Sequence, residues 1–186
     1  MDREPKYLSE FVVVLESLGP TAFQVKYRSS VLVGTGLVGK ILDRGGVSAS
    51  RRTMGTGDCD ELAFAKALMG RVWAVRKDPG APPGPMITVG QSVDNDITIA
   101  EYTLSTQHCG FSFDVTRISL TDLDSMNGTL VNDEAMLPQQ AHPLRTGDRL
   151  ALGRLRFDYL TGHGFFERVY RLLHGAATEP TPVSED

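Results

Sequence analysis

The strongest constraint on the fold of this chain is a series of short apolar runs, between residues 71 and 160, that are separated by turn-forming residues. Several runs alternate apolar and polar side chains, which is the period of a strand with one face on a core. Gly, Asn and Asp between the runs favour tight turns. Many short strands with closely spaced turns predict an all-β sandwich. The predicted strands lie at 71–75, 86–89, 97–99, 110–114, 118–122, 129–131, 149–152 and 155–159.

The sequences on either side of these runs predict helices. Leu8, Phe11 and Leu15 recur at helical spacing, and Gly19-Pro20 ends that helix before a second short one. The segment that follows is rich in Gly, Ser and Thr, and we expect only a short strand there, at 31–33. The predicted organisation is a helical N-terminal extension with a glycine-rich linker at 1–70, a mainly β sandwich of about eleven short strands at 71–160, a C-terminal helix at 161–175 and a disordered tail at 176–186.

Charge and composition argue against several classes of function. The net charge is −4 and the pI is about 5.6, so no basic surface for nucleic acid is expected. The apolar run at 11–15 is far shorter than the ~20 residues of a membrane span. Cys59 and Cys109 lack the spacing of a metal site, and two lone thiols fit a reduced, cytoplasmic setting. We therefore expect no nucleic-acid partner, no membrane partner, no metal and no cofactor.

Three polar clusters fall between predicted strands and should lie on loops. They read Gly-Gln-Ser-Val-Asp-Asn-Asp-Ile at 90–97, Leu-Ser-Thr-Gln-His at 104–108 and Asp-Leu-Asp-Ser-Met-Asn-Gly-Thr at 122–129, and Leu-Arg-Thr-Gly-Asp follows at 144–148. This ordered set resembles the forkhead-associated (FHA) domain, whose fold is a β-sandwich. The resemblance covers roughly residues 71–160. It implies an adaptor that binds phosphothreonine-containing segments of a Ser/Thr kinase or its substrate.

The resemblance also implies roles for particular residues. Ser105 would donate its hydroxyl to a phosphate oxygen, and Asn127 would offer a donor and an acceptor to a peptide backbone. The alternative for both is a local bond within their own turns. His108 is expected to tie the loops together rather than to act as a catalyst. The expected peptide contacts are Gln91, Ser92, Ser105, Thr106, Met126 and Asn127, and the expected structural positions are Gly90, Asn95, His108 and Gly128.

Three positions depart from the family pattern in a way that weakens phosphate binding. The family usually carries an arginine where this chain has Gln91, often a basic residue at Thr106, and often a threonine at Met126. Arginine supplies a charge and a planar fork of donors, whereas glutamine supplies a neutral amide. Residues 90–134 also hold eight acids against one base, Arg117. We therefore expect a weakened dependence on phosphate, unless a distant cation such as Arg145, Arg149 or an N-terminal arginine reaches the loops.

Two other functions compete with phosphothreonine recognition. The first is a phospho-independent interaction or assembly module that uses the same loops or the sandwich faces. The second is a nucleotide-binding enzyme, because residues 34–39 match the Gly-x-Gly-x-x-Gly pattern of dinucleotide-binding folds. That pattern needs a helix and a second parallel strand after it, and Asp43-Arg44-Gly45-Gly46 interrupts any such helix. A flexible glycine linker is the preferred interpretation, and no enzymatic activity is expected. The partner and the oligomeric state are left open by the sequence.

Overall fold

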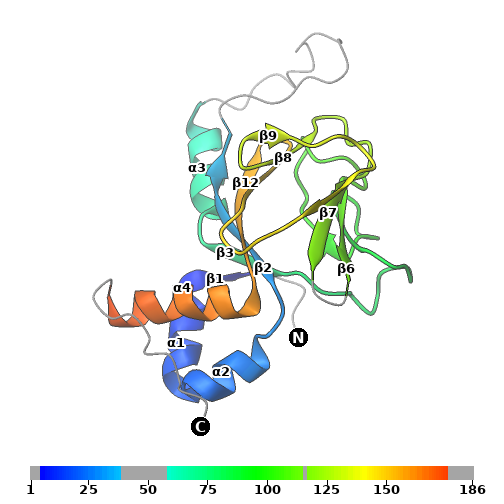
Figure 1. Ribbon diagram of the computed structural model, residues 1–186. Coiled ribbons are helices and arrows are strands. Elements are labelled where there is room, and N and C mark those ends of the chain that lie inside the picture. Colours follow the sequence, from blue (N-terminus) through cyan, green and yellow to red (C-terminus); the bar gives the residue numbers. More distant parts are fainter. Residues whose placement is uncertain (1–4, 39–57, 115–116, 176–186) are drawn as a thin grey trace.

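Two β-sheets form the centre of the computed structural model, which describes residues 5–38, 58–114 and 117–175 (Figure 1). The larger sheet has seven strands in the order β1-β3-β2-β12-β11-β8-β9, and the smaller has five in the order β10-β7-β6-β4-β5. Neighbouring strands are antiparallel except β4 and β5, which are parallel. The strands of the larger sheet are β1 (Lys6–Tyr7), β2 (Val31–Leu37), β3 (Arg71–Ala74), β8 (Thr129–Val131), β9 (Glu134–Ala135), β11 (Arg149–Leu152) and β12 (Leu155–Leu160). Those of the smaller sheet are β4 (Ile87–Gly90), β5 (Ile97–Thr98), β6 (Cys109–Phe113), β7 (Ile118–Asp122) and β10 (Ala141–Pro143).

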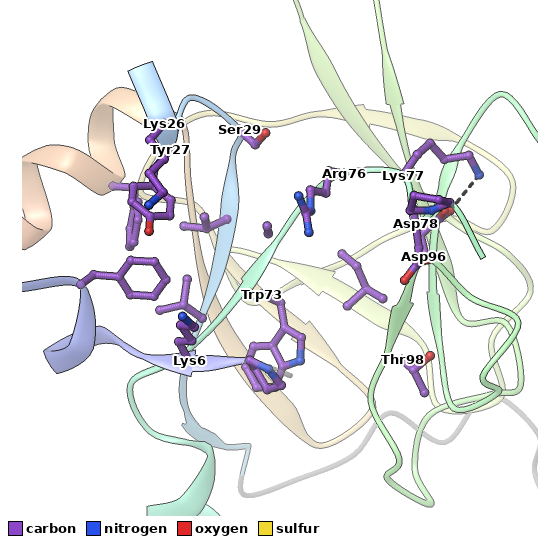
Figure 2. A pocket seen from close by; sticks show the side chains of 18 of the residues that line it. Lys6, Lys26, Tyr27, Ser29, Trp73, Arg76, Lys77, Asp78, Asp96 and Thr98 are labelled. Atoms are coloured by element: carbon purple, nitrogen blue, oxygen red, sulfur yellow. Dashed lines mark hydrogen bonds and ion pairs between the residues drawn. The ribbon is translucent and has the colours of Figure 1, made fainter. Parts of the chain in front are cut away.

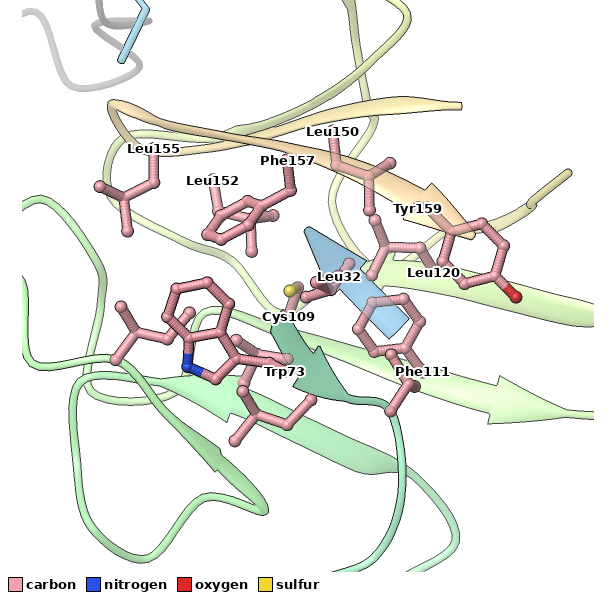
Figure 3. Close-up of a cluster of buried hydrophobic side chains, with 14 of the residues drawn as sticks. Leu32, Trp73, Cys109, Phe111, Leu120, Leu150, Leu152, Leu155, Phe157 and Tyr159 are labelled. Atoms are coloured by element: carbon pink, nitrogen blue, oxygen red, sulfur yellow. The ribbon is translucent and has the colours of Figure 1, made fainter. Parts of the chain in front are cut away.

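Apolar side chains from both sheets fill the space between them (Figure 3). The Trp73 ring meets Phe157 edge to face, with ring centroids 5.6 Å apart, and Phe111 stacks on Tyr159. Cys109 is fully buried in this core, and burial raises the pKa of its thiol. Each of the eight predicted runs contains a strand, so the predicted β-sandwich is confirmed.

Strand β2 corrects the predicted boundary at residue 71 and the predicted glycine-rich linker. It is seven residues long and lies between β3 and β12, so the sandwich includes part of the N-terminal extension. Leu32 faces the core between the sheets, whereas Val31 and Val33 face the helices on the outer side. Because both faces are buried, Val31–Val33 show no alternation with polar residues, and the Gly-Thr-Gly that follows them gave no sign of the length of the strand.

The two glycines of β2 have structural roles, which argues against the dinucleotide hypothesis. A Cβ atom on Gly34 would lie 2.2 Å from the backbone oxygen of Leu68, at the end of helix α3 (Asp58–Leu68). Gly36 has a φ of +136° and pairs with Arg156, where the β2–β12 register shifts. The pattern therefore continues a strand instead of starting a helix at a phosphate. Gly39 lies outside the described residues.

Helices α1 (Leu8–Leu18), α2 (Pro20–Lys26) and α4 (Gly162–His174) gather at one end of the sandwich (Figure 1). Phe11, Phe23 and Phe165 form a second core with the outer face of the larger sheet. The helical segments predicted before and after the sandwich in the sequence are thus present. The predicted tail at 176–186 lies outside the described residues. In the described part of the chain, no helix combines the length and the apolar character that a membrane span needs.

Three strands were missed by the sequence prediction. Strands β1, β9 and β10 are two or three residues long, and every residue in them is exposed. The described residues form twelve strands in total, against the predicted eleven or so. Exposed strands of this length carry no apolar alternation, and only their pairing with a neighbouring strand defines them.

Candidate FHA-type peptide-binding loops

Three loops meet at one end of the sandwich, and direct hydrogen bonds join them. The first follows β4, the second follows β5, and the third connects β7 to β8. The backbone N–H groups of Gln91 and Ser92 donate to the carbonyl oxygens of Ser105 and Thr106 at 3.0 and 3.2 Å. The N–H of Met126 donates to Ser105 Oγ at 3.0 Å. The structure therefore brings these five expected contact residues together.

The hydroxyl group of Ser105 is oriented by its bond with the third loop. Its oxygen accepts the N–H of Met126, and a hydroxyl group has one further proton to donate. The side chain is half-buried, so a ligand can reach it. Ser105 is thus able to donate to an anionic or carbonyl oxygen of a bound segment. The bond that this hydroxyl accepts comes from a residue 21 positions away, so it is not the local bond within one turn that was the alternative.

Gly90 and Asn95 hold the first loop against the second. A Cβ atom on Gly90 would lie 2.4 Å from the carbonyl oxygen of Thr106 and 2.9 Å from Asn95 Nδ2. Asn95 is only 3% exposed, and its Nδ2 donates to the carbonyl oxygens of Ser92 at 2.8 Å and Thr106 at 2.7 Å. Close approach of two backbones is therefore the reason for glycine at position 90.

His108 connects the second loop to the third. The imidazole is fully buried, its Nδ1 accepts the N–H of Ser105 at 3.2 Å, and its Nε2 lies 3.2 Å from the carbonyl oxygen of Gly128. A carbonyl can only accept, so this pattern fits a neutral ring with the proton on Nε2. Gly128 has a φ of +73°, which is favourable for glycine. Both residues therefore act on the shape of the loops.

Asp122 organises the third loop, and the sequence reasoning did not assign it this role. Its fully buried carboxylate accepts the N–H of Ser125 at 3.0 Å and the hydroxyl groups of Ser125 and Thr129, each at 2.6 Å. A buried carboxylate is stabilised when several donors point at it. The Asp-x-x-Ser spacing was a usable signal, because Asp side chains often accept from the backbone and side chains just after them.

Asn127 is less available to a ligand than expected. Its Nδ2 donates to the carbonyl oxygen of Thr103 at 2.8 Å, and the residue is half-buried. An amide nitrogen has two hydrogens, so one N–H and the Oδ1 acceptor are left for a peptide backbone. Met126 beside it is 71% exposed and points no polar group at the site.

The side chain of Gln91 is exposed and makes no hydrogen bond to another described residue. Arg154 lies at the same end of the sandwich as the second loop, because its backbone N–H donates to Thr103 Oγ1. Arg154 Nε lies 2.9 Å from Glu101 Oε1, and the two side chains are 12% and 2% exposed. This guanidinium also lies 4.4 Å from the centre of the Tyr102 ring, so it is held away from a ligand.

The other two proposed cation sources lie elsewhere. The end of β11 near the third loop is Leu152, which pairs with Thr129 at the start of β8, whereas Arg149 lies at the opposite end of β11. The Nη2 of Arg149 lies 2.8 Å from Asp133 Oδ2. Arg145 comes directly after Leu144, whose N–H donates to the carbonyl oxygen of Ile118. Ile118 begins β7, and the third loop follows the other end of that strand. The N-terminal arginines fall partly outside the described residues.

The acids of this region repel an anion less than their number suggested. Glu101 is paired with Arg154, and Asp133 is paired with Arg149. Asp96 Oδ2 lies 2.9 Å from Lys77 Nζ and also accepts the N–H of Thr88. Burial opposes ionisation of Asp96, but these bonds outweigh it and lower its pKa. These three pairs reduce the negative charge of the region, but Asp94 and Asp124 are still exposed on the loops.

Comparison with known proteins decides the family. A model of the FHA domain matches residues 87–153. The oxoglutarate dehydrogenase inhibitor of Corynebacterium efficiens is 33% identical over 108 residues, which cover 55% of this chain and 71% of that protein. The chain belongs to the FHA-domain family.

Other relatives of this FHA protein are regulators too. The glycogen accumulation regulator GarA of Mycobacterium tuberculosis is 30% identical, over 53% of this chain and 71% of its own length. GarA of Mycolicibacterium smegmatis is matched over 48% of its length, so the chain spans only about half of some relatives. A solved structure described as showing phosphothreonine-dependent FHA domain interactions has 22% identity, covers 72% of this chain and 96% of its own, and gives a TM-score of 0.43.

Proposed function

We propose that this FHA protein is a non-enzymatic adaptor whose three loops bind an extended threonine-containing segment of a partner protein. The phosphate of a phosphothreonine adds less to the affinity than it would beside an arginine. The partner is a Ser/Thr kinase or its substrate. The observation that carries the proposal is the pairing of an oriented Ser105 hydroxyl with a neutral, exposed Gln91.

The chemistry of position 91 supports weakened phosphate dependence. A hydrogen bond to a charged group contributes about 1.5–3 kcal/mol, which corresponds to roughly 10- to 150-fold in affinity. Gln91 keeps a donor for a phosphate oxygen but brings no charge. Arg154 is held by Glu101, so among the described residues near the loops it does not supply the missing charge.

Exposed apolar side chains on the loops support a phosphate-independent share of the binding. Val93, Tyr102 and Met126 lie one on each loop and are 69%, 60% and 71% exposed. Burial of apolar surface contributes about 25 cal/mol per Å², whether or not the segment is phosphorylated. These three residues favour the second candidate, a phospho-independent interaction module at the same loops.

The relatives support a regulatory role by binding. They are named as an inhibitor of oxoglutarate dehydrogenase and as a regulator of glycogen accumulation. Both names describe action on another process, which fits an adaptor. Neither partner is carried over to this chain by name.

A peptide titration tests the proposal. Fluorescent libraries centred on phosphothreonine, with matched unphosphorylated libraries, are titrated against the wild type, Gln91→Arg and Ser105→Ala. We expect the wild type to bind both forms within about tenfold of each other, and Gln91→Arg to gain about 10- to 100-fold for the phosphorylated form alone. Ser105→Ala should weaken both forms.

Gln24→Arg is the matched control, because Gln24 is exposed on α2 and the substitution changes the net charge equally. An equal gain with Gln24→Arg would mean that overall charge, and not position 91, controls binding. Wild-type binding that disappears on dephosphorylation, with no further gain from Gln91→Arg, would refute weakened phosphate dependence. Wild-type binding to neither form, with no gain in Gln91→Arg, would refute the loops as the binding site.

A further inference from the structure

A cavity of about 670 Å³ lies between the helices and one open edge of the sandwich (Figure 2). It touches the first loop only at Asp96 and is not lined by any of the expected peptide contacts. Its walls come from α1, α2 and α4 on one side and from β3, β5 and the chain after β3 on the other. A volume of this size is typical of sites for small organic ligands, which occupy roughly 300–1,000 Å³. The proposed peptide-binding function does not use it.

Aromatic side chains form an apolar floor that other aromatic rings hold in place. Phe11 meets Tyr27 at 5.3 Å and Phe165 at 5.0 Å, both edge to face. Trp73 is held edge to face by Phe157 and is 7% exposed. Because these rings are fixed by packing in two separate cores, the floor is formed before any ligand binds.

The rim of the cavity is positively charged in a chain whose net charge is −4. Figure 2 shows Lys6 and Lys26 on the helical side, Arg76 across from them, and the Lys77–Asp96 ion pair at the far side. Among the described residues that line the cavity, four cations stand against two acids, a formal excess of two positive charges: Lys6, Lys26, Arg76 and Lys77 against Asp78 and Asp96.

The observations favour a small ligand over a segment of a partner protein. An added strand needs a free sheet edge of several residues, and the edge strands at this side, β1 and β5, are each only two residues long. A compact ring system that carries an anionic group matches both the fixed aromatic floor and the cationic rim. Attraction of the anion to that rim is strengthened where the walls exclude water.

We propose that this cavity binds a small organic anion with an aromatic body. Two probes test the two halves of that description: 8-anilinonaphthalene-1-sulfonate and its uncharged analogue N-phenyl-1-naphthylamine. Trp73 is the only tryptophan of the chain, so quenching of its emission reports on this cavity directly. We expect saturable binding of one equivalent of the sulfonate to the full chain, with quenching of Trp73, and about tenfold weaker binding of the neutral analogue.

Charge-neutral variants locate the binding. The double variant Lys26→Gln/Arg76→Gln should weaken sulfonate binding about tenfold and leave binding of the neutral probe unchanged. The matched control is Lys66→Gln/Arg171→Gln, which removes the same charges from exposed positions outside the cavity and should bind like the wild type. Circular dichroism of both variants checks that they fold alike.

Four results would overturn the proposal. The first is equal affinity for the two probes, and the second is binding of the sulfonate without a change in Trp73 emission. The third is a control variant that weakens sulfonate binding as much as Lys26→Gln/Arg76→Gln does. The fourth is displacement of the probe by an acetyl-Glu-Phe-Glu-Phe-Glu-amide peptide at lower concentration than by 1-naphthalenesulfonate, which would favour an acidic segment of a partner. If the double variant fails to fold, the single variant Lys26→Gln with the same two probes decides between these outcomes.

Discussion

Substitution of Gly90 by alanine should strongly destabilise the fold, because it forces two loop backbones apart. The added Cβ would lie 2.4 Å from the Thr106 carbonyl oxygen, whereas contacts under 3.0 Å essentially do not occur, so the oxygen must move by about 0.6 Å. That oxygen accepts Ser92 N–H and Asn95 Nδ2, so both bonds are strained. Overpacking costs about 1–3 kcal/mol, and each weakened bond about 0.5–1.5 kcal/mol. We expect a loss of about 2–6 kcal/mol in the free energy of unfolding.

Urea denaturation followed by Trp73 emission measures this loss, and Gly84→Ala is the matched control. A Cβ on Gly84 would meet no atom within 4 Å, and its φ lies outside the left-handed region. The control should change stability by less than about 1 kcal/mol, in the stabilising direction if unfolded-chain entropy dominates. Gly90→Ala should also weaken peptide binding to the loops. If Gly90→Ala and Gly84→Ala had equal stability, the close approach would not explain glycine at position 90.

Three further predictions follow from buried groups. Asp122→Asn should lower the free energy of unfolding, measured in urea, by about 2–4 kcal/mol, because two buried hydroxyl groups lose a charged acceptor. Asp124→Asn, on the exposed part of the same loop, should lower it by less than about 1 kcal/mol. Equal losses would contradict the role of Asp122. Cys109 should resist Ellman's reagent at pH 8 in a Cys59→Ser background until the protein unfolds, since burial raises its thiol pKa; reaction of the native protein within seconds would contradict its burial. The pKa of Asp96 in the folded state lies below its usual 3.8, so the ionised carboxylate stabilises the fold above pH 3.8, and this stabilisation is lost as the pH falls further. Urea unfolding between about pH 5 and about pH 2 should show this loss in the wild type and not in Asp96→Asn.

The predicted strands of the sandwich were correct where one face of a strand is buried. In β12, buried and half-buried residues alternate over the first four positions, and the sequence alternates with them. For β2 the predicted short strand at 31–33 was correct, but its extension to Leu37 and its place inside the sandwich were missed. Leu32 and Val33 face two different cores, and burial on both faces removes the alternation. A pattern along one chain shows which side chains avoid water, but it does not show which second surface covers them.

The same limit applies to the binding loops. The sequence correctly grouped the positions of Gln91 and Ser105, since turn residues between short strands place them at one end of a sandwich. It could not show that Asn127 already holds Thr103, or that Glu101 neutralises Arg154. Those contacts join residues 24 and 53 positions apart, and only the packing of the loops brings them together.

The framework of the loops and their recognition chemistry are physically separable in this protein. Asn95, His108 and Asp122 hold the loops through buried hydrogen bonds that involve no ligand. Gln91 contributes its backbone N–H to that framework, but its side chain is exposed and unbonded among the described residues. Gln91→Arg should therefore change stability by less than about 0.5 kcal/mol while it changes phosphate affinity by an order of magnitude or more. Under the proposed function, a change at this one surface position is enough to alter dependence on phosphate, without any repacking of the loops.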